Sequence, residues 1–176
     1  MATTISGDTG IDKVADGADM PAGSVIQVID FNNVTETNIT VAGAWVVVGG
    51  TEQYITLKGS GGRINVQYNL SAEVDGSVNN SYPIIRLQWN VNGGSWTSSN
   101  NSRQALNAGV NDDGAAHTSF MYTIASSDIS ATTGDIVGFR IEHIQSLTGS
   151  IHYNQSGIGS DGGGTRTHGL FMEIAG

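Results

Sequence analysis

The chain has 176 residues, a formal net charge of −9 and no cysteine. This length suits one domain with a short extension, and the lack of cysteine excludes disulfides and thiolate metal sites. Because nucleic acid is bound by basic surfaces, the acidic balance speaks against nucleic acid as a partner. No apolar run approaches the ~20 residues of a membrane-spanning helix, so we expect no membrane insertion.

The first part of the chain, residues 1–23, differs in pattern from the rest. Ser, Gly, Thr and Asp dominate it, and neither helix nor strand periodicity is sustained. We interpret it as an extended arm, and two alternatives stay open: a frayed terminus, or an arm that orders against a partner. In the second case four apolar residues would make the attachment: Ile5, Ile11, Val14 and Met20.

Strand signals fill the rest of the chain, residues 24–176, and Gly-rich turns separate them. In Arg63 to Glu73, for example, apolar and polar residues alternate, which is typical of a sheet with one buried face. A single helical turn is expected at Asp128 to Thr132. The predicted strands are 25–29, 34–41, 45–48, 54–57, 63–73, 85–90, 120–124, 135–143, 151–153 and 170–174.

The number and spacing of these segments indicate the fold class. Roughly eight to ten short strands with a turn about every 8 to 12 residues are typical of a sandwich or jelly roll. Leu170, Met172 and Ile174 share one face of the last strand, and Val137, Phe139 and Ile141 share one face of an earlier strand. We therefore expect an all-β protein, an antiparallel β-sandwich of jelly-roll type with an extended N-terminal arm.

Two polar stretches, residues 97–115 and 154–164, contain few large apolar residues and predict long loops, which are often functional in compact domains. Trp96 follows a Gly-Gly turn, so we expect it to be exposed, where its ring can stack on a sugar. Trp89 lies on the apolar face of its strand and is expected in the core. The candidate receptor-binding residues are Trp96, Asn100, Asn101, Arg103, Asn111, Asp112, Tyr153 and Asn154.

A search for catalytic and metal motifs is negative. No phosphate-binding loop, Gly-x-Ser-x-Gly elbow or His-Glu-x-x-His helix occurs, so we expect no enzyme, no catalytic residue and no cofactor. No metal site is expected either, although three copies of one histidine on a trimer axis remain an alternative. A carboxylate pair for glycoside hydrolysis is also left open, because the separation it needs is three-dimensional. Its candidates are Glu52, Glu73, Asp75 and Glu142.

Five short segments, in their order along the chain, resemble segments of phage tail-fibre and virion appendage proteins. They are Met1 to Val14, Pro21 to Val28, Ile55-Thr56-Leu57, Arg63-Ile64-Asn65-Val66 and Leu170 to Ala175. The stretch from about 75 to 165 does not match. Gly59 to Gly62 stands where the commoner family pattern has a Ser/Thr-Pro-rich segment.

This resemblance implies a small jelly-roll knob that assembles as a homotrimer in the virion. The arm, residues 1–23, would attach the knob to other virion proteins, and the exposed loops would face the host surface and a possible glycan there. The first hypothesis is therefore a short trimeric tail fibre. A capsid decoration protein that stabilises the head is the alternative, and a glycan depolymerase is a more remote one.

Overall fold

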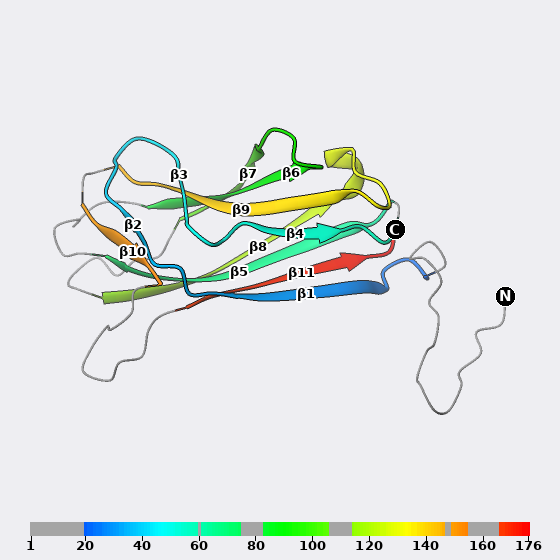
Figure 1. The fold of residues 1–176 in the computed structure, drawn as a ribbon, viewed down its shortest axis with the longest axis horizontal. Coiled ribbons are helices and arrows are strands. Elements are labelled where there is room, and N and C mark those ends of the chain that lie inside the picture. The colour runs from blue at the N-terminus through cyan, green and yellow to red at the C-terminus, as the bar shows by residue number, and fades with distance from the viewer. Residues whose placement is uncertain (1–19, 60, 75–82, 106–113, 147–148, 155–165) are drawn as a thin grey trace, which may run out of the picture.

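The computed structural model describes residues 20–59, 61–74, 83–105, 114–146, 149–154 and 166–176 of the chain. Most of the expected attachment arm, including Ile5, Ile11 and Val14, lies outside these ranges, and Met20 stands at their beginning, half-buried in a bend. The described residues form two antiparallel sheets that face each other (Figure 1). Within the described ranges no helix has the length and apolar character of a membrane span.

The first sheet has six strands, and β5 pairs on one side with β8 and on the other with β11 and β10 in succession. β1 then pairs with β11, and β2 pairs with β10. The bounds of these strands are β1 (Val25–Asn33), β2 (Thr37–Ile39), β5 (Arg63–Val74), β8 (Gly114–Ala125), β10 (Ile151–Tyr153) and β11 (Thr167–Ile174).

The second sheet has five strands. β3 and β4 pair with successive parts of β9, which pairs with β6, and β6 pairs with β7. A 3-10 turn, Ser126–Ile129, precedes β9 close to the expected helical turn. The bounds are β3 (Val46–Val47), β4 (Gln53–Thr56), β6 (Ile84–Val91), β7 (Thr97–Ala105) and β9 (Ile136–Ile144).

The strand order confirms the predicted fold. Across the first sheet the main strands run β1, β11, β5, β8, and across the second they run β3 or β4, β9, β6, β7. Each sheet thus interleaves early and late strands of the chain, which is the double Greek-key order of a jelly roll. β1 and β11 lie side by side in Figure 1, so residues near the two limits of the described chain share one sheet.

The core lies between the inner faces of the two sheets. In β5 the apolar residues Ile64, Val66, Tyr68 and Leu70 are all buried, as their alternation predicts. Phe171 of β11 is central: its ring centroid lies 5.1 Å from that of Phe139 and 5.8 Å from that of Tyr68. These edge-to-face rings join the two sheets, because Phe139 belongs to β9 of the second sheet.

The last strand reverses the orientation that its apolar pattern favours. Leu170, Met172 and Ile174 share one face as predicted, but they are only half-buried and point away from the core. The buried positions between them hold Gly169, Phe171 and Glu173. The buried carboxylate of Glu173 accepts hydrogen bonds from the backbone N–H groups of Lys58 at 3.0 Å and Gly59 at 2.7 Å. These bonds compensate for the loss of water around the carboxylate.

Two other predictions need correction. Only Thr37–Ile39 of the expected strand 34–41 is a strand. The expected long loop from residue 97 is a strand as far as Ala105, because this edge strand places short polar side chains, such as the buried Ser102, where larger apolar residues would mark a core strand.

Candidate functional site

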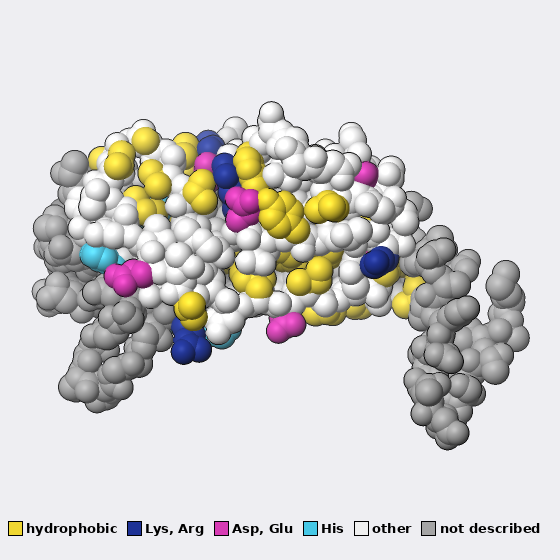
Figure 2. Space-filling model, in the orientation of Figure 1, with side chains coloured by type: hydrophobic (Ala, Val, Ile, Leu, Met, Phe, Trp, Pro, Cys, Tyr) yellow, Lys and Arg dark blue, Asp and Glu magenta, His cyan; other side chains and the backbone are white. Residues whose placement is uncertain are grey.

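Charged and aromatic side chains gather on the outer face of the second sheet. Val137, Phe139 and Ile141 of β9 point into the core, so Arg140 and Glu142 lie on the opposite side. Basic, acidic and hydrophobic side chains lie next to one another over β9 and β4 in Figure 2. We call this surface the Arg–Trp face, and its residues are Trp45, Glu52, Tyr54, Arg86, Gln88, Trp96, Arg103, Arg140 and Glu142.

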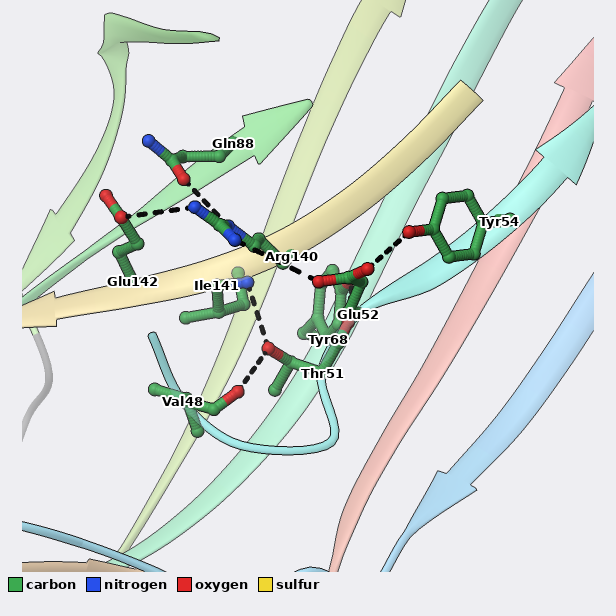
Figure 3. Close-up of polar contacts among 9 residues, drawn as sticks. All are labelled: Val48, Thr51, Glu52, Tyr54, Tyr68, Gln88, Arg140, Ile141 and Glu142. Atoms are coloured by element: carbon green, nitrogen blue, oxygen red, sulfur yellow. Dashed lines mark hydrogen bonds and ion pairs between the residues drawn. The ribbon is translucent and has the colours of Figure 1, made fainter. Parts of the chain in front are cut away.

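Arg140 is the centre of the polar network on this face (Figure 3). Its Nε donates to Gln88 Oε1 at 2.8 Å. Its two terminal nitrogens lie 3.7 Å from Glu142 Oε1 and 3.9 Å from Glu52 Oε2. The guanidinium also lies over the ring of Trp96, 4.1 Å from the centroid. Arg140 is therefore held in one orientation by four neighbours from different segments.

A second arginine–tryptophan contact lies farther along the same face. Arg86 of β6 binds Glu142 Oε2 through Nε at 2.8 Å and through Nη2 at 2.7 Å. Its guanidinium lies over the ring of Trp45, 4.0 Å from the centroid, and that of Arg103 lies 5.5 Å from the same ring. Glu142 thus links the two clusters, because Arg86 and Arg140 both contact its carboxylate.

Glu52 lies in the loop between β3 and β4, and the buried residue before it, Thr51, anchors that loop. Thr51 is fully buried, and its hydroxyl donates to Val48 O at 2.7 Å and accepts from the Ile141 N–H at 3.1 Å. The Tyr68 hydroxyl donates to Thr51 O at 2.9 Å, and burial raises the pKa of Tyr68 well above its ordinary value, so this group remains a donor. Figure 3 shows the two hydrogen bonds of the Thr51 hydroxyl beneath Arg140.

Tyr54 extends the network along β4. Its hydroxyl donates to the Glu52 carboxylate, and this hydrogen bond raises the pKa of Tyr54. Gly138 of β9 makes room for the ring: a Cβ at that position would lie 2.7 Å from Tyr54 Cε1 and 2.8 Å from Asn90 Oδ1. The glycine therefore leaves space for the Tyr54 ring beside β9.

A projection from β7 borders the face. Ser98 pairs with Gln88, and Arg103 pairs with Arg86. Between these two pairs β7 advances by five residues while β6 advances by two, so β7 contains extra residues. The extra residues bulge outward, and the buried Ser102 anchors them by donating to Leu87 O at 3.1 Å. Asn100 and Asn101 are exposed on this bulge, as expected of candidate receptor-binding residues.

The structure brings some predicted site residues together and excludes others. Trp96 and Arg103 belong to the Arg–Trp face, and Trp96 is half-buried against Arg140, whereas an exposed ring was expected. Trp89 packs against the core as predicted. Asn111 and Asp112 lie outside the described residues.

Tyr153 and Asn154 require a correction, because both are buried. The Tyr153 hydroxyl lies 2.6 Å from His143 Nδ1 inside the sandwich. The Asn154 side chain donates to Thr35 O at 3.0 Å and accepts from the Thr167 hydroxyl at 2.8 Å. These side chains bind β10 and the residue after it to neighbouring segments. Because they are almost entirely buried, a receptor could not contact them.

Sequence reasoning missed the residues at the centre of the face. Trp45 stands in an apolar run that looks like core, and Arg86 and Arg140 are isolated in sequence. The signal was present in β9, where Arg140 and Glu142 occupy the positions that alternate with the apolar residues. Only the pairing of β6 with β9 brings Arg86 to Glu142.

The outer face of the first sheet offers a weaker candidate. A hollow of about 240 Å³ lies there, lined by residues that include Gln67, Met121, Leu170 and Met172. Small-molecule sites usually span about 300–1,000 Å³. In the described part of the chain, no three His, Asp or Glu residues are grouped so as to hold a metal ion.

The chemistry of the Arg–Trp face suits the recognition of sugars. Aromatic rings offer flat apolar surfaces, and arginine and glutamine side chains offer planar groups of hydrogen-bond donors. The face concentrates scarce residue types, since it holds two of the three tryptophans. The chain has seven basic residues, of which Lys13 and Lys58 are lysines, so five are arginines, and three of these five lie here.

Comparisons with known proteins leave the family open. No family model matches the chain, and no curated protein matches it. Among solved structures, a chain from the structure of infectious bursal disease virus Gx strain is similar to it, with 15% sequence identity and a TM-score of 0.42. The match covers 85% of this chain and 36% of that chain, so this chain spans about a third of the viral protein's length.

Proposed function

We propose that this chain is a structural protein of a virion, a short trimeric phage tail fibre whose jelly-roll knob contacts a glycan on the host surface. The observation that carries the proposal is the Arg–Trp face, where three of the five arginines and two of the three tryptophans gather on one side of the sandwich. A rigid sheet holds these side chains in fixed positions, which reduces the entropy lost on binding.

The order of short segments that resembles phage tail-fibre and appendage proteins supports the virion assignment. The jelly roll agrees with the knob that this resemblance implies. In a trimer three copies of the face would act together, and several weak glycan contacts would give strong attachment. The arm, residues 1–23, is the proposed link to other virion proteins.

A structural role without catalysis fits the state of the carboxylates on the face. Glu142 is bound by Arg86 and Arg140, and Glu52 is bound by Tyr54 and lies near Arg140. Of the four carboxylates considered for glycoside hydrolysis, these two are therefore engaged with neighbouring side chains. We propose that neither acts as a catalytic acid, and that purified protein leaves host polysaccharide at its original length.

The function is tested by competition for host cells. Purified protein should reduce adsorption of the virions, and the double variant Trp96→Ala/Asn101→Ala should compete less well. The matched control is Met121→Ala, because Met121 is 73% exposed on the other sheet. If saturating protein leaves adsorption unchanged, the fibre function is wrong and the capsid decoration protein becomes the better hypothesis.

The trimer is tested separately by sedimentation equilibrium. The proposal predicts a species with three times the chain mass. A protein that remains monomeric at every concentration would contradict the trimeric assembly, whatever the adsorption assay shows.

A further inference from the structure

Two arginines meet at one end of the Arg–Trp face. Arg86 and Arg103 are register partners on neighbouring strands, and both guanidinium groups lie over the ring of Trp45. Arg86 is neutralised by Glu142 at 2.7 Å. The exposed Arg103 forms no ion pair and donates no side-chain hydrogen bond within the described part of the chain.

Within the described part of the chain, this arrangement leaves one of the two arginines without a counter-charge. Like charges directly opposite each other on paired strands are destabilising. Arg103 is exposed, and within the described residues its guanidinium lies over the Trp45 ring but pairs with no carboxylate, so its charge has no counter-charge there. The face carries three arginines and two glutamates, a surplus of one positive charge, whereas the whole chain carries −9. An anion bound beside Arg103 would supply the missing counter-charge.

We propose that Trp45, Arg86 and Arg103 form a site for an anionic sugar, one that carries a carboxylate or a sulfate ester. This inference rests on the proposed glycan-binding function of the same face and names its ligand class. The planar guanidinium of Arg103 pairs with the anionic group through two parallel hydrogen bonds, and Arg86, which is already paired with Glu142, lies over the same Trp45 ring. The Trp45 ring provides an apolar surface beside the sugar ring.

The test measures binding of the full chain to three defined oligosaccharides of equal length. Galacturonate, galactose and 6-sulfated galactose oligomers differ only in the group at carbon 6. We expect the galacturonate or the sulfated oligomer to bind at least tenfold more tightly than neutral galactose, and which of the two binds identifies the anion. The preference for the anionic oligomer should decrease as the salt concentration is raised, because salt screens ion pairs between an exposed arginine and the ligand.

Arg103→Gln should weaken binding of the preferred anionic oligomer by about tenfold, since a hydrogen bond to a charged group is lost. The matched control is Arg63→Gln, which removes an exposed arginine from the other sheet and should change affinity by less than about twofold. Trp45→Phe should remove any change in tryptophan fluorescence on binding. An equal loss in Arg103→Gln and Arg63→Gln would show attraction to net charge alone and would overturn the site.

The outcomes separate this inference from the proposed function. If neutral and anionic oligomers bind equally well, or none binds while the protein still blocks virion adsorption, the anionic site is wrong and the adhesive function stands. If the protein fails to block adsorption but binds anionic oligomers through Arg103, the site stands and the tail-fibre function fails.

Discussion

Gly169 shows how one residue shapes the core. A Cβ at this position would lie 1.9 Å from Phe31 Cζ, because the ring of Phe31 packs directly over the glycine. Gly169→Ala should therefore lower the free energy of unfolding by about 1–3 kcal/mol, the usual cost of overpacking. Urea denaturation measures this change.

The double variant Phe31→Leu/Gly169→Ala supplies the control for that prediction. If the ring causes the clash, the two changes together should cost less than the sum of the single changes. Strict additivity would contradict the contact.

His143 should make stability depend on pH. It is fully buried between Tyr153 and Gln145, and burial lowers its pKa from 6.5 to about 4. Below pH 6.5 the unfolded chain binds a proton that the folded protein does not, so stability is lost as the pH falls from 6.5 toward 4. The size of the pKa shift implies that His143 lowers the free energy of unfolding by about 3 kcal/mol when the pH falls through this whole interval.

The measurement compares unfolding free energies at pH 7 and pH 4.5 for the native chain and His143→Gln. The native chain should lose more stability than the variant over this interval. Equal losses in both proteins would mean that carboxylates alone cause the acid sensitivity.

At the scale of elements, the loop between β3 and β4 connects the core to the Arg–Trp face. Thr51→Val would remove the acceptor of the buried Ile141 N–H at 3.1 Å and the donor to Val48 O. The expected loss is about 1–3 kcal/mol, with faster hydrogen exchange at the Ile141 amide. Thr56→Val, on an exposed position of β4, is the matched control and should be nearly neutral. Unchanged exchange at Ile141 would contradict this role of Thr51.

The strands differ in how far the sequence predicts them. β5 was predictable because its inward positions are uniformly apolar. β11 was misleading because its inward positions include Gly169, which leaves space for Phe31, and Glu173, which binds the backbone of a distant loop. β7 was missed because an edge strand with a buried serine lacks an apolar stripe. Such positions are determined by tertiary contacts, which sequence periodicity does not contain.

The candidate site was predictable only at its border. Asn101 and Arg103 were identified from a polar stretch of sequence and Trp96 from the Gly-Gly turn before it, and all three lie on or beside the Arg–Trp face. Its centre depends on pairing between strands far apart in the chain, such as Arg86 with Glu142 across 56 positions. The burial of Tyr153 and Asn154 was also not predictable, because it results from contacts with segments that are distant in sequence.

In the whole molecule, the jelly roll serves both as a rigid support and as a surface for contacts. The sheets provide a rigid body, and the outer face of one sheet provides a surface with concentrated arginine and tryptophan side chains. The proposed arm would place this surface at the tip of a virion appendage. The proposed function therefore depends on where the chain sits in the virion.

Immunogold electron microscopy of purified virions locates the chain in the particle. An antibody against this chain is used, and virions from a mutant lacking the chain are the control. A tail fibre should give gold particles at the tail end of native virions and none on the mutant. Gold spread evenly over the capsid would contradict the tail-fibre assignment and favour a decoration protein, and native virions without label would contradict a virion role altogether.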